Sequence, residues 1–366
     1  MLTIKTPEEY RCERDILKQV GEFVSRYGRR AFIISGETAW KAVEDVLSAS
    51  LEKWKIDFKV HIMKGYPTYD KVVRYASESV DEQADLVIGV GGGRVCDVAK
   101  GTANHRNLPA VMIPTVAATC ACWAARSILY TDDGDFDRIL WNEHNPNMIL
   151  ADTKVLAKAP KRFLAAGILD TQAKWYEFEP LIDSDPGDVV LRLDVAISKL
   201  AFDILEELGA KAMTDTSTEE EFRQVLDSVF FLAGASGSFA NGKAYRGFAH
   251  SYYYATTRIS ESRHRLHGEK VAFGLLVQFV LKEKREVFLD HYLDELLSYG
   301  ITDIPEDWNT RDTEDTEKKI AELILKESPI VVEKKFVSNS IECADAIHKA
   351  SGLLRSKRND YGKQYV

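Results

Sequence analysis

The chain has few cysteines, few histidines and no long apolar run. Its 366 residues include five cysteines and eight histidines, and no stretch of about 18 apolar residues occurs. An odd number of cysteines without a repeated Cys-x-x-Cys spacing predicts reduced thiols, not a disulfide framework or a structural zinc site. The missing apolar run and the lack of a visible export signal predict a cytoplasmic protein that does not span a membrane.

Positive charge is also in short supply. The 48 Lys and Arg residues are outnumbered by 57 Asp and Glu residues, which gives a formal net charge of −9. Nucleic acids and anionic membranes are recognised by clustered Lys and Arg, so neither is an expected partner. A small molecule is the expected substrate. At roughly 100 to 200 residues per domain, the length predicts about two domains.

The first 152 residues alternate short apolar segments with amphipathic ones. Apolar segments occupy residues 31–35, 58–63, 85–90, 110–113 and 147–150, and helical periodicity occupies residues 38–54 and 69–81. A β-α-β-α-β order of this kind predicts a parallel sheet with helices on both faces. Residues 1–152 are therefore predicted to form an α/β domain.

From residue 161 onward, segments with apolar residues at i, i+3 and i+4 dominate. They occupy residues 191–208, 219–232, 270–284, 287–299 and 316–327. Residues 153–366 are therefore predicted to form an all-α domain. Two domains that pack directly leave a cleft, which is a preferred place for ligands. We interpret the charge runs at residues 219–221 and 311–319 as solvated helix faces or loops.

A run of glycines follows the third apolar segment. Gly91, Gly92 and Gly93 lead into a helix that carries Asp97 one turn further on. Such a turn lets backbone N–H groups approach an anion such as a pyrophosphate. A plain strand-to-helix turn is the alternative, since the spacing differs from G-x-G-x-x-G and Asp97 suits the positive end of a helix. The loop at residues 114–122 is expected at the same edge of the sheet.

Three of the eight histidines fall within residues 250–267. Neutral imidazoles and a carboxylate are the usual ligands of a catalytic Zn²⁺ or Fe²⁺. His250 and His267 meet only if the segment between them folds back, with a second helix starting at His267. Asp170 is the candidate carboxylate, because an unpaired acid inside an apolar helix is costly. A capped helix with surface histidines explains the same pattern, and His264 is an alternative ligand to His267.

Four segments taken together resemble a known family. They are residues 89–100 (GVGGGRVCDVAK), 113–119 (IPTVAAT), 151–177 (ADTKVLAKAPKRFLAAGILDTQAKWYE) and 267–274 (HGEKVAFG). In this order and spacing they resemble the iron-containing (group III) alcohol dehydrogenase family, in its glycerol dehydrogenase and hydroxycarboxylate dehydrogenase branch. The resemblance implies a dehydroquinate-synthase-like fold with a dinucleotide-binding domain at residues 1–152 and a helical, metal- and substrate-binding domain at residues 153–366. We also expect a homo-oligomer.

The resemblance assigns roles to individual residues. Asp170, His250 and His267 match the ligands of one divalent metal, for which we expect Zn²⁺ in preference to Fe²⁺. Glu37 matches the acidic residue that binds the adenosine ribose, and a carboxylate there repels a 2′-phosphate, which favours NAD over NADP. The other positions expected to line the dinucleotide are Gly91, Gly92, Gly93, Arg94, Asp97, Thr115, Thr119 and Tyr130.

Several positions depart from glycerol dehydrogenases. Cys120 stands where those enzymes carry an aspartate that is expected to hold the substrate's hydroxyl groups, so the contact to a second hydroxyl is missing. Ala118 and Ala124 stand where hydroxyl residues often line the cofactor. Lys174 stands four residues after Asp170, on the same helix face, where iron-type enzymes carry a histidine ligand. Lys174 either pairs with Asp170 or receives a substrate carboxylate.

The sequence therefore predicts an NAD(P)- and metal-dependent oxidoreductase that interconverts a small 2-hydroxy acid and its 2-oxo acid. The alternatives are a glycerol or small-polyol dehydrogenase that tolerates Cys120 and, more distantly, a non-redox lyase of the dehydroquinate synthase type. In the predicted reaction, hydride passes between the substrate carbon and the nicotinamide. The residues expected to act on the substrate are Lys174, Cys120 and, through the metal, Asp170, His250 and His267.

Overall fold

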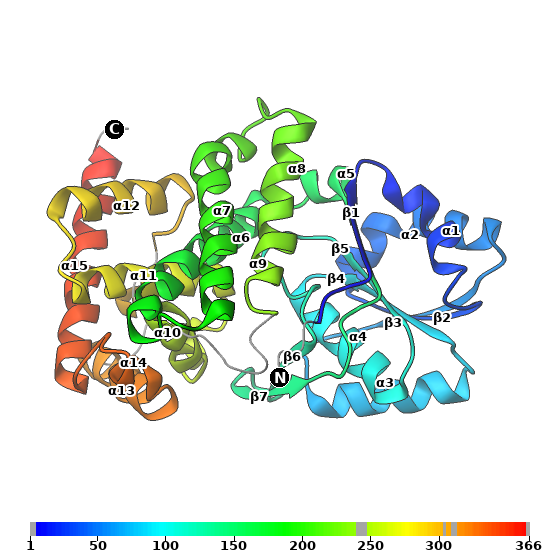
Figure 1. Cartoon of the computed structure of the whole chain (residues 1–366), viewed down its shortest axis with the longest axis horizontal. Helices are drawn as coiled ribbons and strands as arrows, with labels where there is room; N and C mark the ends of the chain where they lie inside the picture. Colours follow the sequence, from blue (N-terminus) through cyan, green and yellow to red (C-terminus); the bar gives the residue numbers. More distant parts are fainter. Residues whose placement is uncertain (1–4, 239–246, 303–304, 309–312, 364–366) are drawn as a thin grey trace.

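The computed structural model of the chain describes residues 5–238, 247–302, 305–308 and 313–363. Figure 1 shows two halves side by side, with a sheet and its helices in one half and helices alone in the other. The fold class predicted from the sequence is therefore confirmed. The exact boundary after residue 152 stays a prediction.

The α/β half is built on a six-stranded sheet in which every pairing is parallel. In spatial order its strands are β1 (Glu9–Glu13), β8 (Met148–Asp152), β5 (Ala110–Pro114), β4 (Leu86–Gly91), β2 (Arg30–Ser35) and β3 (Asp57–Ile62). Strands β4, β5 and β8 are buried along their whole length, which explains why they appear in the sequence as continuous apolar runs.

Helices cover both faces of this sheet. The helices are α1 (Val20–Val24), α2 (Glu37–Lys53), α3 (Tyr69–Asp81) and α4 (Gly93–Arg106). Side chains alternate along β2, so Phe32 and Ile34 pack into one core with residues of α3 and α4. Ile33 faces the other core, with residues of α1 and α2. The predicted doubly covered parallel sheet is confirmed.

Two parts of the α/β half have no counterpart in the prediction. Strand β1 has the sequence EYRCE, in which Cys12 alone is fully buried, so it lacks an apolar run. Strands β6 (Arg126–Tyr130) and β7 (Phe136–Trp141) form an antiparallel hairpin outside the main sheet. The hairpin is half-buried and mixes charged with apolar residues, so neither strand stands out in the sequence.

The described part of the second half is helical, as predicted. Its α-helices are α5 (Thr153–Ala157), α6 (Lys161–Phe178), α7 (Val189–Ala212), α8 (Glu219–Asp227), α9 (Ala233–Ala235), α10 (Phe248–Thr257), α11 (His267–Leu281), α12 (Glu286–Ser298), α13 (Thr313–Glu327), α14 (Ile330–Glu333) and α15 (Ser340–Lys363). Residues 219–232 are helical throughout, as predicted, although they do not form one regular α-helix. Helix α8 ends at Asp227, and a π-helical turn over Ser228–Leu232 follows, in which the Ser228 hydroxyl donates to the Gln224 carbonyl.

Helix α6 packs deep inside the second half and is buried over most of its length. Two glycines allow close approach to its neighbours. A Cβ on Gly268, at the start of α11, would lie 1.9 Å from the Ala166 carbonyl oxygen. A Cβ on Gly167 would lie 2.1 Å from the Ala117 carbonyl oxygen, in the loop after β5. Helix α6 is thus held between α11 and the α/β half.

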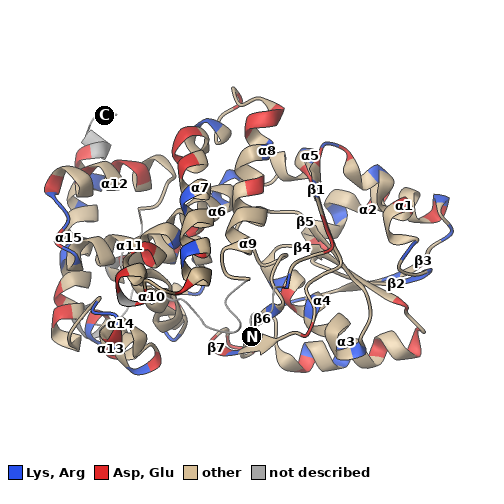
Figure 2. Cartoon of the chain, in the orientation of Figure 1, with Lys and Arg blue, Asp and Glu red and all other residues tan. Residues whose placement is uncertain are grey.

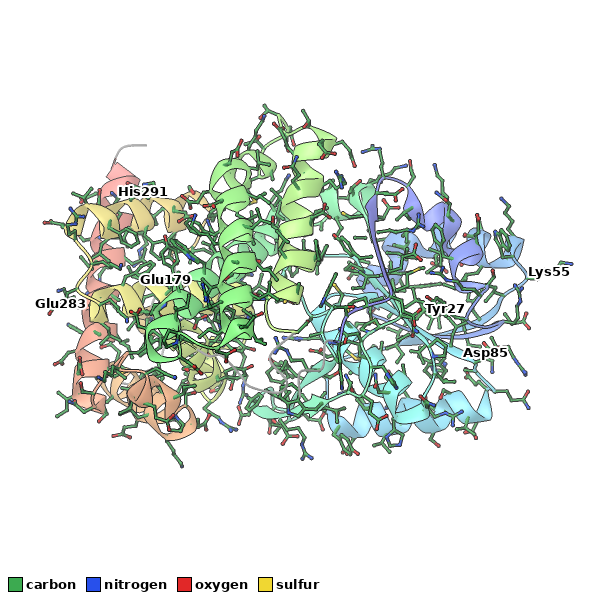
Figure 3. All side chains as sticks on the ribbon, in the orientation of Figure 1. Tyr27, Lys55, Asp85, Glu179, Glu283 and His291 are labelled. Atoms are coloured by element: carbon green, nitrogen blue, oxygen red, sulfur yellow. The ribbon has the colours of Figure 1, made fainter. Side chains whose placement is uncertain are left out.

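Charged residues of both signs are spread over the molecule (Figure 2), and the described helices are not long apolar segments. Figure 2 shows Lys and Arg beside Asp and Glu on both halves of the molecule, and residues of both colours lie along α3. Charged side chains such as Lys55 and Asp85 lie toward the outer end of the α/β half, and Glu283 toward that of the helical half (Figure 3). No helix in the described ranges is long and apolar enough to cross a membrane.

Replacing Gly268 by alanine tests the close contact between α11 and α6. The added methyl group would collide with the Ala166 carbonyl, so Gly268→Ala should lower the free energy of unfolding by about 1–3 kcal/mol. Gly352→Ala is the matched control, because no atom lies within 4 Å of a Cβ there, in helix α15. That variant should gain about 0.5–1 kcal/mol. Thermal unfolding of both variants measures the difference, and equal melting temperatures would contradict the assignment.

Candidate active site

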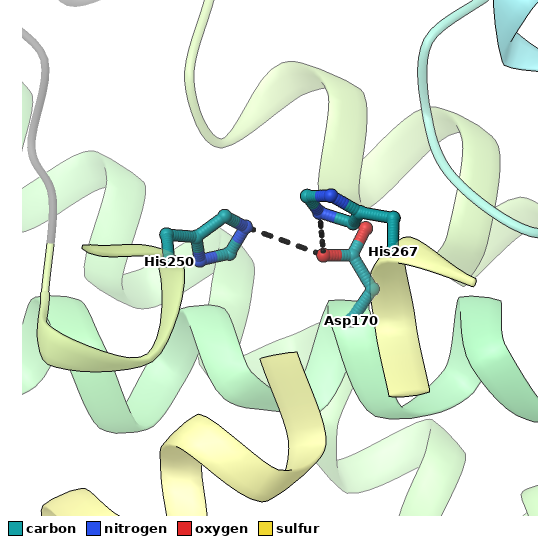
Figure 4. A group of neighbouring side chains, drawn as sticks. All are labelled: Asp170, His250 and His267. Carbon is teal, nitrogen blue, oxygen red and sulfur yellow. Dashed lines mark hydrogen bonds and ion pairs between the residues drawn. The ribbon is translucent and has the colours of Figure 1, made fainter. Parts of the chain in front are cut away.

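Asp170, His250 and His267 lie together where three helices meet. Figure 4 shows Asp170 from α6 between the two imidazole rings, which come from α10 and the first residue of α11. The Nε2 atoms of His250 and His267 lie 3.3 and 3.0 Å from Asp170 Oδ1. One ligand atom from each residue lies within 4.8 Å of the others. The segment between the histidines folds back, and α11 starts at His267, so the condition for the two histidines to meet is fulfilled.

Glu177 supports this cluster from the same helix as Asp170. Its side chain is fully buried, accepts the backbone N–H of His250 at 2.8 Å and contacts His250 Nδ1. A carboxylate on Nδ1 fixes the ring so that Nε2 faces Asp170. Glu177 is not among the residues predicted from the sequence. The available signal was its spacing, since residues 170 and 177 are two helical turns apart on one face.

The electrostatics of the cluster suit a cation. Burial opposes a charge on His250, but the carboxylates of Glu177 and Asp170 outweigh it and raise the pKa of His250 to about 9. Burial would also raise the pKa of Asp170, yet His267 and His250 hold it well below its ordinary value. Two imidazole nitrogens converging on a buried carboxylate are the donor set of a catalytic Zn²⁺ or Fe²⁺ site. These residues therefore fit a divalent metal.

Two neighbouring residues complete the surroundings of His267. His264, the alternative ligand, is exposed, and its ring lies beside the Arg265 guanidinium, so it does not join the cluster. The Tyr253 ring packs edge-on against the His267 ring, with centroids 4.1 Å apart. The Tyr253 hydroxyl lies 2.5 Å from the hydroxyl of Tyr130, on β6. His267 is therefore connected, through Tyr253, to Tyr130, which is expected to line the cofactor.

The glycine turn and the following loop meet at one edge of the sheet. Gly91 ends β4, and α4 begins at Gly93. The Thr115 backbone N–H donates to the Gly91 carbonyl at 3.2 Å. A Cβ on Gly93 would lie 3.1 Å from Thr119 Oγ1. The structure thus brings these predicted cofactor residues together, because the carboxyl ends of adjacent parallel strands share one edge. Their role in dinucleotide binding stays a prediction.

The remaining predicted cofactor residues lie in different environments. Glu37 starts α2 after β2, the neighbour of β4 in the sheet, and its exposed carboxylate pairs with Lys41 at 2.8 Å. The Arg94 guanidinium packs over a tyrosine ring, with 4.3 Å to the centroid. Asp97 is buried in an ion pair with Lys100 at 3.0 Å. Burial raises the pKa of Asp97, and Lys100 opposes the rise.

Lys174 reaches the α/β half. Its ammonium donates to Cys120 Sγ at 3.1 Å and to the Ala233 carbonyl at 2.7 Å. The side chain is buried, whereas Cys120 is half-buried. Within the described ranges, the hydrogen bonds of Lys174 therefore go to neutral partners and not to Asp170. Lys174 and Cys120, both predicted to act on the substrate, are therefore in direct contact.

Comparison with known proteins identifies the family. Residues 7–153 match the family model for iron-containing alcohol dehydrogenase. A glycerol dehydrogenase of Pseudomonas putida is 30% identical over 321 residues, which cover 84% of this chain and 87% of the relative. The chain belongs to the iron-containing alcohol dehydrogenase family. Membership implies an enzyme that acts on CH–OH donors with a nicotinamide dinucleotide and a divalent metal.

Further relatives agree with this family. Hydroxycarboxylate dehydrogenase A of Escherichia coli (strain K12) is 33% identical over 232 residues, which cover 62% of this chain and 64% of the relative. The crystal structure of a probable glycerol dehydrogenase from Sinorhizobium meliloti 1021 matches with a TM-score of 0.85, 23% identity and coverage of 97% of this chain and 100% of that one. The fold is therefore that of these dehydrogenases, which is dehydroquinate-synthase-like.

Removing the charge of Glu177 should weaken metal binding without removing a ligand. We expect Glu177→Gln to lower the affinity for Zn²⁺ by about 10- to 100-fold, because His250 loses the carboxylate that orients it. Glu179→Gln, two residues further on and exposed (Figure 3), is the control and should bind Zn²⁺ as the unmodified protein does. Competition titration against a chromogenic chelator measures both affinities. Identical affinities for the two variants would contradict the role of Glu177.

Proposed function

We propose that this enzyme interconverts a small hydroxy compound of the glycerol class and the corresponding carbonyl compound, with NAD and one divalent metal, Zn²⁺ in preference to Fe²⁺. The observation that supports it best is the convergence of Asp170, His250 and His267 beside Tyr253, which meets Tyr130 of the α/β half. The glycerol dehydrogenases among the relatives favour this substrate class. A cytoplasmic location and a homo-oligomeric assembly stay predictions from the sequence.

The residues of the chain divide the work between the two halves. Asp170, His250 and His267 would hold the metal, and Glu177 fixes the ring of His250. The glycine turn at residues 91–93 would hold the pyrophosphate at the start of α4. When bound, the metal supplies Lewis-acid polarisation of the substrate oxygen, and the nicotinamide exchanges a hydride with the substrate carbon.

A second candidate is the interconversion of a 2-hydroxy acid and a 2-oxo acid. It is favoured by one contact, that of the Lys174 ammonium with Cys120. A cation there suits a carboxylate, and the loss of the aspartate at position 120 removes a charge that would repel one. The relative named hydroxycarboxylate dehydrogenase A supports the same class.

The redox reaction can be followed directly by the absorbance of the reduced nicotinamide. We expect NAD reduction with glycerol or a close analogue, loss of turnover after metal chelation, and recovery when Zn²⁺ is added back. His267→Ala should abolish the metal-dependent turnover, whereas His264→Ala, which alters an exposed ring, should retain it. Turnover that survives both chelation and His267→Ala would refute the metal assignment. If the protein binds NAD but no hydroxy compound or carbonyl compound tested changes the absorbance of the nicotinamide, a lyase would be favoured.

The choice between NAD and NADP should depend on Glu37. Its exposed carboxylate would repel the 2′-phosphate of NADP, and solvent weakens this repulsion. We therefore expect Glu37→Gln to raise kcat/KM for NADP by about 5- to 10-fold. Glu44→Gln, exposed on the same helix, serves as the control and should leave the ratio of NADP to NAD activity unchanged. An equal ratio in all three proteins would mean that Glu37 does not contact the ribose.

A further inference from the structure

Lys174 is a buried cation whose hydrogen-bond partners are neutral. Its side chain is 6% exposed, and its ammonium contacts the thiol of Cys120 and the carbonyl of Ala233. Buried ammonium groups are normally paired with a carboxylate, because desolvation of an unpaired charge is costly. Asp170, one helical turn away, is committed to the metal donor set. The environment of Lys174 therefore leaves room for a further negative charge.

Arg126 also lies against this segment of the helical half and, like Lys174, acts on the charge of Asp194. It is the first residue of β6, and its guanidinium is half-buried. Atom Nη2 lies 3.3 Å from the position that a Cβ on Gly237 would occupy, in the turn after α9. Lys174 takes the carbonyl of Ala233 at the start of α9. Among the described residues, the Arg126 guanidinium has no hydrogen bond or ion pair. Both cations therefore contact residues 233–237, and neither is hydrogen-bonded to a carboxylate among the described residues.

Asp194 of α7 is the buried carboxylate influenced by both cations. It is fully buried, and within the described ranges neither carboxylate oxygen has a hydrogen-bond partner. Burial raises the pKa of Asp194 to about 7, while Lys174 and Arg126 oppose the rise. A carboxyl group with that pKa carries only part of a charge near neutral pH. The net charge of the group formed by Lys174, Arg126 and Asp194 is therefore positive.

We propose that Lys174 and Arg126 together bind a carboxylate on the substrate. The inference rests on the proposed redox function and develops its second candidate, because it makes the preferred substrate a glycerol-sized hydroxy acid with a carboxylate at one end. The planar guanidinium can hold two carboxylate oxygens at once, and the ammonium adds a point charge. Lys174 lies one helical turn from Asp170, so the carboxylate lies beside the metal-bound end of the substrate. Cys120, in place of an aspartate, leaves this position free of a repelling charge.

The test compares two substrates that differ only in this group. Hydroxypyruvate carries a carboxylate where dihydroxyacetone carries a hydroxymethyl group, and both can be reduced with NADH in the presence of Zn²⁺. We expect the unmodified enzyme to prefer hydroxypyruvate. Arg126→Met should lower kcat/KM for hydroxypyruvate by about 10- to 100-fold, mainly through KM, and lower that for dihydroxyacetone much less. Lys174→Met is the second variant and should shift the ratio in the same direction.

Arg138→Met is the matched control, because Arg138 is an exposed cation on the other strand of the same hairpin. It should leave the ratio of the two kcat/KM values unchanged. A preference for dihydroxyacetone that Arg126→Met does not alter would overturn the inference and leave the redox function standing. An equal loss with both substrates and a higher KM for NADH would also overturn it, since Arg126 would then bind a cofactor phosphate. No NADH oxidation with either compound would overturn both proposals.

Discussion

A buried carboxylate on a buried helix is the constraint on which the rest of the site depends. Asp170 and Glu177 both lie on α6, with their side chains shut off from solvent. Neither charge is tolerable without compensation. Two imidazole rings from other helices provide it, and this requires α10 and α11 to approach α6 closely. Gly268 makes the approach of α11 sterically feasible, since any side chain there would meet the backbone of α6. Helix α6 therefore carries both buried carboxylates and is also the helix against which α11 packs closely.

The features that the sequence predicted correctly are those that local patterns determine. Strands β4 and β5 are continuous apolar runs, and runs of this kind identify buried parallel strands. Parallel strands place their carboxyl ends at one edge, so the glycine turn and the loop with Thr119 had to lie together. The metal cluster was a different case. The two histidines are seventeen positions apart in the sequence, and only the family motifs selected His267 over His264.

The features that the sequence could not predict arise from tertiary contacts. Helical spacing offered Asp170 as the partner of Lys174, but its ammonium turns to Cys120 and Ala233, which are 54 and 59 positions away along the chain. Nothing in the sequence around Arg126, the first residue of a short strand, indicates a functional role. Its significance is that no described residue is its counter-ion, which is a property of the folded chain. Glu177 was missed for a related reason, because an acid near a helix end is ordinary until its burial is known.

The hydrogen bond between Tyr130 and Tyr253 joins the α/β half to the helical half, which carries all three proposed metal ligands. Tyr253 also forms one wall of the space occupied by the His267 ring. Any hinge motion that parts the halves at this point must break the hydroxyl contact and release that wall. A motion that separated the two halves for cofactor exchange would therefore also reduce the packing that holds the His267 ring in place.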